Sequence, residues 1–112
     1  MPRRLSEHKA VENPGVKWAE SHGVKVTKTV ALGRAGWPDR TFWFYGGRPF
    51  MAELKSPGCP PSPLQLHTIK ELKELGYDVE VFDNKESFIQ ALQVRYSISK
   101  CLKKRHETDR RL

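Results

Sequence analysis

The chain has 112 residues, of which 38% are hydrophobic and 29% charged, and it carries a formal net charge of +7. This length allows one hydrophobic core and excludes two domains of ordinary size, while the composition excludes a disordered chain. A basic balance of this size in so small a domain favours a polyanionic partner, although it can also serve solubility alone.

The sequence also bears on the cellular compartment. Its two cysteines, Cys59 and Cys101, have neither a zinc-ligand spacing nor a Cys-x-x-Cys pairing, which favours a reduced, intracellular protein. No apolar run approaches the roughly 20 residues of a membrane span, and the first residues lack the apolar region of a secretory signal. We therefore expect a cytoplasmic protein with no membrane partner.

Apolar periodicity and turn residues predict a helix, three strands, a helix, a strand and a final helix. The expected ranges, in chain order, are 5–22, 24–30, 40–45, 48–55, 63–75, 78–82 and about 84–96. Asn13-Pro14 should interrupt the first helix, because Asn is a good N-cap and Pro a good first helical residue, and Gly23 should end it. The basic residues from Ser99 onward are expected to be frayed or only weakly helical.

The order of these elements predicts an α/β fold with a mixed sheet flanked by helices. A helix joins the strands at 48–55 and 78–82, so these two strands should be parallel. Gly46-Gly47, between the strands at 40–45 and 48–55, is a hairpin signal, so that pair should be antiparallel.

Two carboxylates and a lysine lie where the hairpin could bring them together. Asp39 follows Gly36-Trp37-Pro38 before one strand, and Glu53-Leu54-Lys55 ends the next. Taken separately, Pro38-Asp39 is most often a turn and Glu53-Leu54-Lys55 an exposed charge pair. Together they favour a metal-dependent phosphodiesterase, since two carboxylates can hold a hard divalent cation and a lysine can stabilise developing charge or orient water.

The hairpin must meet a condition for this site to exist. Side chains alternate between faces along a strand, and a strict two-residue turn at Gly46-Gly47 would set Asp39 opposite Leu54, on the wrong face. A three-residue turn or a bulge would set Thr41 opposite Glu53 and Asp39 opposite Lys55. The turn should therefore be wider than two residues, or bulged.

Gln65 has two interpretations. Ser62-Pro63-Leu64-Gln65 is a capping-box pattern, which would account for the glutamine as a helix cap. Gln65 also falls on the helix face that must meet the sheet, so its amide should be buried near Glu53 and need a partner such as a metal-bound water or a phosphate oxygen. The residues alone leave both interpretations open.

The motifs in combination resemble the VRR-NUC domain, the virus-type replication–repair branch of the PD-(D/E)xK nucleases. They are Gly-x-Pro-Asp, Glu-Leu-Lys, Ser-Pro-x-Gln at a helix start, and Leu-x-x-Leu-Gly-Tyr-x-Val-x-Val. The resemblance covers roughly 7–92, and we expect a VRR-NUC nuclease domain over 1–96 with a basic tail over 97–112. It implies a restriction-endonuclease-like αβββαβ core, Mg²⁺ or Mn²⁺ as cofactor, and hydrolysis of phosphodiester bonds in branched or structured DNA. Stand-alone members of this size are expected to form homodimers and cut four-way (Holliday) junctions.

The resemblance also implies roles for individual residues. Asp39 and Glu53 would be the central metal ligands, with the backbone carbonyl of Leu54 completing the shell. Lys55 would act on the nucleophilic water, and Gln65 would be the family's helix glutamine near the catalytic residues. A glutamate on the first helix would join them: Glu12 is favoured and Glu7 is the alternative, although Asn13-Pro14-Gly15 departs from an uninterrupted helix.

Five cations and the basic tail are candidates for binding DNA phosphates, and each cation could instead belong to a solvated charged face. The five cations are Lys25, Lys28, Arg34, Arg40 and Arg48. Two further functions remain open: a flap or single-strand nuclease of the same fold, and a basic nucleic-acid-binding module without catalysis.

Overall fold

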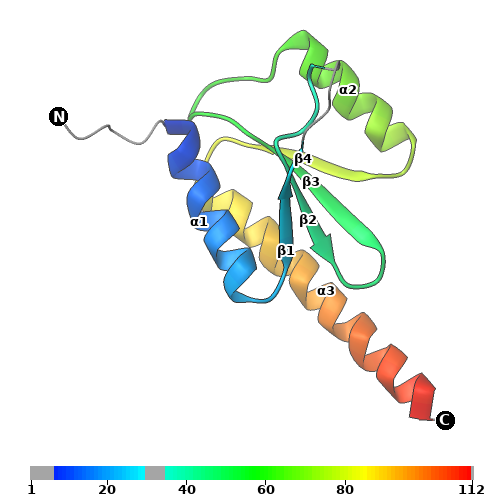
Figure 1. The fold of residues 1–112 in the computed structure, drawn as a ribbon. Coiled ribbons are helices and arrows are strands. Elements are labelled where there is room, and N and C mark those ends of the chain that lie inside the picture. The colour runs from blue at the N-terminus through cyan, green and yellow to red at the C-terminus, as the bar shows by residue number, and fades with distance from the viewer. Residues whose placement is uncertain (1–6, 30–34, 112) are drawn as a thin grey trace.

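The computed structural model describes residues 7–29 and 35–111, which form seven elements around one four-stranded sheet (Figure 1). In chain order these elements are α1 (Glu7–Ser21), β1 (Lys25–Lys28), β2 (Arg40–Phe44), β3 (Arg48–Leu54), α2 (Pro63–Glu74), β4 (Asp78–Phe82) and α3 (Lys85–Arg111). Both the type and the order of the predicted elements are confirmed. None of the helices in the described ranges is long and apolar enough to cross a membrane.

The sheet has the strand order β1-β2-β3-β4. The β1–β2 and β2–β3 pairs are antiparallel, and β3 pairs with β4 in parallel, across the connection through α2. The predicted mixed sheet is therefore confirmed. Its one parallel pair follows from the helix placed between β3 and β4, since parallel neighbours need a long crossover.

Helices cover both faces of the sheet. One face carries Phe42, Phe50 and Leu54, which pack in a single cluster with residues of α1 and α3 such as Val11 and Phe88. The opposite face meets α2 through the cluster of Ile69, Leu72 and Val79 with the partly buried Met51 and Trp37. Strand residues alternate between the two layers, so Glu53 belongs to the α2 face while its neighbours Ala52 and Leu54 belong to the other.

The expected break in the first helix at Asn13-Pro14 is wrong, because α1 runs continuously through Pro14. Proline removes one backbone donor and strains the preceding turn. The next residue, Gly15, is buried, and a Cβ built there would lie only 2.1 Å from Cε2 of Phe88 in α3. Close packing of α1 on α3 at this glycine offsets the cost of the proline. The helix ends before Gly23, which has φ +77°, as expected.

The end of the chain departs further from the prediction. The last helix was expected to end near Tyr96, followed by a frayed or weakly helical tail, but α3 continues to Arg111. Its second half projects beyond the sheet (Figure 1). It is tied back to the β2–β3 hairpin by a 2.8 Å hydrogen bond between Tyr45 Oη and His106 Nδ1. The expected tail over 97–112 is thus, through Arg111, a continuation of the helix that covers the sheet.

Candidate nuclease site

The β2–β3 turn satisfies the condition set by the sequence. Phe44 pairs with Arg48, so the turn has three residues, Tyr45-Gly46-Gly47, and both glycines adopt positive φ. The expected partner of Thr41 was wrong by two residues: Thr41 faces Met51 rather than Glu53, because the third turn residue is Tyr45 and not Arg48. Continued by one residue beyond β2, this register sets Asp39 beside Glu53 on the α2 face, so the expected position of Asp39 opposite Lys55 was also wrong by two residues.

Asp39 is held by main-chain groups from two neighbouring strands. Its carbonyl oxygen accepts a 2.9 Å hydrogen bond from the N–H of Thr29, just after β1. Its Oδ2 atom accepts a 3.0 Å hydrogen bond from the N–H of Leu54 at the end of β3. Sequence reasoning did not find Thr29, which becomes visible only once β1 and β2 are paired. Together these bonds fix the Asp39 carboxylate next to the residue that follows Glu53.

Glu53 is a buried carboxylate with incomplete hydrogen bonding. Its exposed fraction is 2%. Its Oε1 accepts a 3.2 Å hydrogen bond from Gln65 Nε2 and lies 3.9 Å from Lys55 Nζ. Among the described residues, its buried Oε2 has no hydrogen-bond partner. A buried oxygen of this kind is costly unless a cation or donor reaches it.

The electrostatic surroundings of Glu53 disfavour its negative charge. Burial is the largest cause, the Asp39 carboxylate acts in the same direction through its charge and through a hydrogen bond that a protonated Glu53 can donate to it, and the Lys55 ammonium opposes these effects. Together they raise the pKa of Glu53 from 4.5 to about 8. The fold therefore favours a protonated Glu53, or a bound cation that offsets the charge of its carboxylate.

Gln65 is the helix cap that one interpretation expected, and it approaches Glu53 as the other expected, but its side chain is half-buried and its partner there is the carboxylate itself. Its Oε1 accepts a 2.8 Å hydrogen bond from the N–H of Ser62, and its own N–H is bonded to Ser62 Oγ, which completes the capping box at the start of α2. Its Nε2 points the other way and donates to Glu53. One amide thus couples the start of α2 to the carboxylate pair.

The chain is similar to known proteins in sequence and in structure. No family model matches the sequence. "Putative nuclease p44" of Acyrthosiphon pisum secondary endosymbiont phage 1 is 34% identical over 83 residues, which is 74% of this chain and 89% of that protein. A solved structure described as a VRR_NUC domain has a TM-score of 0.73 at 22% identity and covers 80% of this chain and 97% of its own. A second, described as a VRR_NUC domain protein, has a TM-score of 0.69 at 21% identity and covers 85% and 91%.

The chain belongs to the VRR-NUC nuclease family. Its predicted restriction-endonuclease-like arrangement, a mixed sheet between helices, is the fold of the two VRR_NUC structures. In this VRR-NUC nuclease, Asp39, Glu53, Lys55 and Gln65 converge at the end of β3 that faces away from the hairpin.

Glu12 makes a different contact from the other expected ligands. It is 4% exposed, and its Oε1 accepts a 2.6 Å hydrogen bond from Arg40 Nε in an ion pair between α1 and β2. Across residues 7–29 and 35–111, no group of three or more His, Cys, Asp or Glu side chains is placed to hold a metal ion. The role of Glu12 as a metal ligand stays a prediction, and the side chain of Glu7 lies outside the described part.

Four of the five candidate DNA-binding cations are among the described residues, and they lie at the two ends of the sheet. Lys28 and Arg40 pair across β1 and β2 next to Asp39, and Arg40 is engaged by Glu12. Lys25 and Arg48 are exposed at the hairpin end. Arg34 lies outside the described residues. Their contact with DNA stays a prediction.

The carboxylate pair suits the divalent cation that the VRR-NUC resemblance implies. All of its side-chain donors are carboxylate oxygens, the ligands that Mg²⁺ and Mn²⁺ prefer. The buried Glu53 Oε2 has no hydrogen-bond partner in the described part of the chain, and the surroundings of Glu53 disfavour its negative charge in the absence of a cation. Asp39 and Glu53 would hold the ion, with the Leu54 carbonyl as the predicted third ligand.

Proposed function

We propose that this VRR-NUC nuclease is a divalent-metal-dependent endodeoxyribonuclease that hydrolyses phosphodiester bonds in branched DNA, with four-way junctions as its preferred substrate. The observation that carries the proposal is the pairing of Asp39 with the buried Glu53, whose Oε2 has no hydrogen-bond partner among the described residues. We further propose that it works as a homodimer, in the cytoplasm of a bacterium or phage-infected cell.

The residues around the pair have distinct tasks in this scheme. When bound, Mg²⁺ or Mn²⁺ polarises the scissile phosphate and lowers the pKa of a coordinated water. Lys55, whose Nζ lies 3.9 Å from Glu53 Oε1, brings a positive charge to where the attacking water and the phosphate meet. Gln65 holds Glu53 in place through its 3.2 Å hydrogen bond. Hydrolysis would leave a 3′-hydroxyl and a 5′-phosphate.

The proposal of a homodimer and the proposal of a branched DNA substrate support each other. One chain of 112 residues has a single Asp39–Glu53 pair. Two symmetric cuts across a junction require two such pairs, which a two-fold dimer supplies most simply. The net charge of +7 favours binding to a substrate that presents many phosphates.

Cleavage of matched substrates tests the proposal. A labelled four-way junction, a flap, a single strand and a linear duplex of the same sequence are incubated with the protein and Mg²⁺ or Mn²⁺. Its molecular mass is measured by light scattering. We expect paired cuts near the junction centre by a dimer. Equal cutting of the linear duplex would contradict junction preference, and a monomer that cuts the junction symmetrically would contradict the dimer. Junction binding without any cutting would indicate the non-catalytic binding module.

A further inference from the structure

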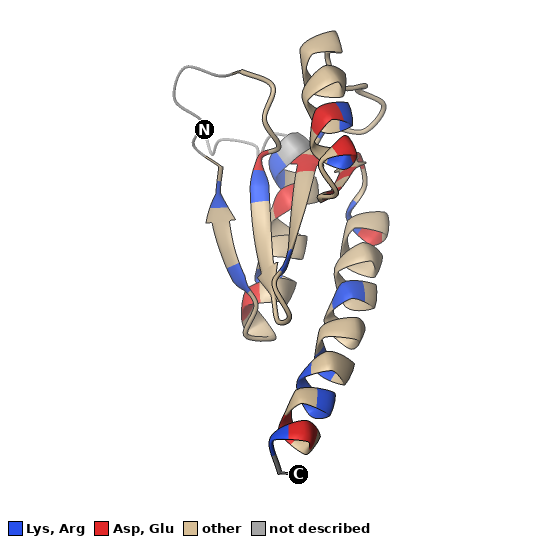
Figure 2. Ribbon diagram, turned by 90° about the vertical axis from the view of Figure 1, so that its right-hand side faces the viewer, with Lys and Arg blue, Asp and Glu red and all other residues tan. Residues whose placement is uncertain are grey.

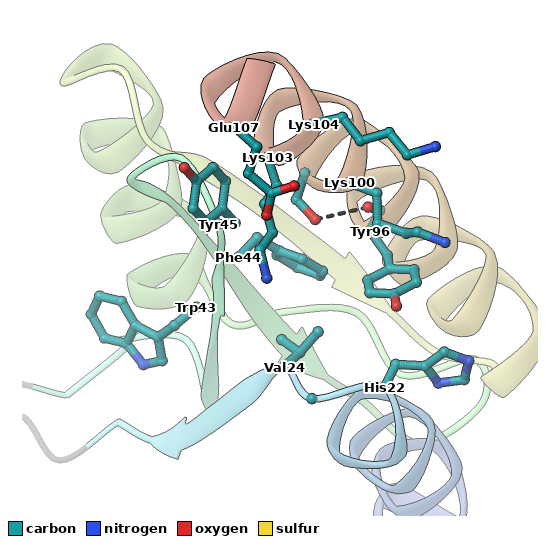
Figure 3. A pocket seen from close by; sticks show the side chains of 12 residues that line it. His22, Val24, Trp43, Phe44, Tyr45, Tyr96, Lys100, Lys103, Lys104 and Glu107 are labelled. Carbon is teal, nitrogen blue, oxygen red and sulfur yellow. Dashed lines mark hydrogen bonds between the residues drawn. The ribbon is translucent and has the colours of Figure 1, made fainter. Parts of the chain in front are cut away.

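Figure 3 shows a groove of about 600 Å³. It lies at the hairpin end of the sheet, whereas the carboxylate pair lies at the other end. It runs between the residues that lead into β1, the hairpin end of β2 and the second half of α3. Its aromatic lining includes Phe44, Tyr45 and Tyr96, and three lysines from α3 line it as well, Lys100, Lys103 and Lys104. Trp43 also contributes, but its side chain points away from the lysines (Figure 3).

The aromatic side of the groove is held in place by packing. His22 stacks on Trp18 with ring centroids 4.1 Å apart, and Tyr96 meets both rings edge-on at 5.3 and 5.6 Å. On the other side, the hydrogen bond between Tyr45 Oη and His106 Nδ1 fixes the hairpin against α3. The groove therefore has walls that exist before any ligand binds, which reduces the entropy lost on binding.

The groove carries an excess of positive charge. Lys100, Lys103 and Lys104 are exposed, and within the described ranges none of the three forms an ion pair. Lys100 Nζ lies 5.4 Å from the centre of the Tyr96 ring, a cation–π contact. Glu107 is the carboxylate that lines the groove. Lysines and arginines recur along this projecting half of α3 (Figure 2), so the charge continues beyond the groove.

The groove is too far from the carboxylate pair for one phosphate group to contact both places. Phe44 lines the groove and lies five residues along the chain from Asp39, which corresponds to about 17 Å at the rise of a β-strand. Phe44 also belongs to the cluster on the α1 and α3 face, whereas Glu53 belongs to the α2 face. A ligand that reaches both places must therefore be long and extend past one face of the sheet, and about 17 Å of duplex DNA corresponds to roughly five base pairs at about 3.4 Å each.

We propose that this groove binds the phosphate backbone of a DNA arm away from the scissile phosphate, with Lys100, Lys103 and Lys104 as the contacting cations. The inference rests on the proposed function, in which the substrate is branched DNA. A helix places residues i and i+4 on one face about 6 Å apart, so Lys100 and Lys104 present two separate charges. This spacing suits successive phosphates of a DNA strand better than one small anion. Tyr45 and Tyr96 add flat surfaces beside the lysines.

The test compares two triple variants with the same loss of charge. In the groove variant, Lys100, Lys103 and Lys104 are each changed to Gln. In the control, three exposed lysines outside the groove, Lys17, Lys73 and Lys85, are changed in the same way. Binding to a labelled four-way junction is measured by fluorescence anisotropy in EDTA, across a series of salt concentrations, and melting temperatures confirm that both variants are folded.

We expect the groove variant to bind at least about tenfold more weakly at 0.1 M salt, with a salt slope smaller by about 2 to 3, since each lost phosphate contact removes about 0.9. The control should change binding by no more than about threefold. Equal losses in both variants would overturn the inference. A groove variant that changes molecular mass but keeps its DNA affinity would also overturn it, because the groove would then be a contact between copies of the chain.

A gain-of-binding variant provides a second, independent test. Glu107→Gln removes the carboxylate that lines the groove and should tighten junction binding several-fold, whereas the exposed Glu74→Gln on α2 should not. Equal effects of the two substitutions on junction binding would contradict the proposal that the groove binds DNA. Cutting by wild type with metal is measured alongside: if wild type does not cut, the proposed function fails, whereas the groove result is read from binding alone.

Discussion

Replacing Glu53 with glutamine should stabilise the metal-free protein at high pH. The pKa of Glu53 is 4.5 in an unperturbed chain and about 8 in the fold, because burial and Asp39 disfavour its charge. The folded state therefore holds a proton that the unfolded state releases between these two pH values. Stability from the protonated form is fully present below pH 4.5 and is lost as the pH rises through 8. The side chain introduced by Glu53→Gln is uncharged at every pH, so the variant does not lose this stability as the pH rises.

The magnitude follows from the interval between the two pKa values. At about 1.36 kcal/mol for each pH unit, the interval corresponds to roughly 5 kcal/mol at most, a large share of the 5–15 kcal/mol that stabilise a typical domain. At pH 5 the wild-type carboxyl is largely protonated, so the two proteins should differ little. At pH 9 the variant should be more stable by several kcal/mol, on the order of that upper limit.

Urea unfolding in EDTA at pH 5, 7 and 9 measures the difference directly. Comparison with wild type cancels the other titrating groups, and the exposed Glu74→Gln serves as a matched control that should show no such trend. A difference between wild type and Glu53→Gln that stays constant from pH 5 to 9, or that falls with pH, would refute the reasoning about burial and Asp39.

Three further predictions follow from the same geometry. Mg²⁺ or Mn²⁺ at 100 times its Kd should raise the free energy of unfolding of wild type by about 2.7 kcal/mol, which is measured as a higher melting temperature. Glu53→Gln should abolish this rise, and an equal rise in the variant would place the ion elsewhere. Gln65→Ala should lower the free energy of unfolding in urea by about 1–2 kcal/mol and should also lower the rate of DNA cleavage. Ser62→Ala should lower stability alone, so equal cleavage by the two variants would refute a role for Gln65 beyond the helix cap. Gly15→Ala should cost about 1–3 kcal/mol by overpacking against Phe88, and an unchanged midpoint in urea would contradict that contact.

Local sequence signals predicted the site wherever a short-range pattern decides the geometry. The Ser62-Pro63-Leu64-Gln65 pattern located the start of α2, and the face of Gln65 on that helix predicted its approach to Glu53. Alternation along the strands required a turn wider than two residues, and the three-residue turn meets that requirement. These outcomes depend on hydrophobic periodicity and on helix capping, both of which are determined by residues close together in the sequence.

The departures arise from contacts between distant residues. Tyr45 belongs to the turn, and its hydroxyl is bonded to His106, 61 positions away in a segment expected to be frayed. The cost of Pro14 inside α1 is offset by Gly15 packing on Phe88, which no local rule for proline includes. Tertiary packing overrides propensity in both places.

The partner of Glu12 was unpredictable for the same reason. Arg40 lies 28 residues further along the chain, and its pairing with Glu12 depends on how α1 packs across β2. From the sequence, Glu12 was expected at the metal and Arg40 at DNA phosphates. Their ion pair engages both side chains at once, so each predicted role needs its own measurement.

Metal-dependent cleavage by matched variants tests the central claim most directly. Wild type, Asp39→Asn, Glu53→Gln and the exposed control Glu74→Gln are given a labelled four-way junction with Mg²⁺ or Mn²⁺, and with EDTA. We predict cutting by wild type and Glu74→Gln only when metal is present, and a loss of at least about a hundredfold in both site variants while they still bind the junction. Metal-dependent cutting that survives in both Asp39→Asn and Glu53→Gln would contradict the assignment of this carboxylate pair as the catalytic centre.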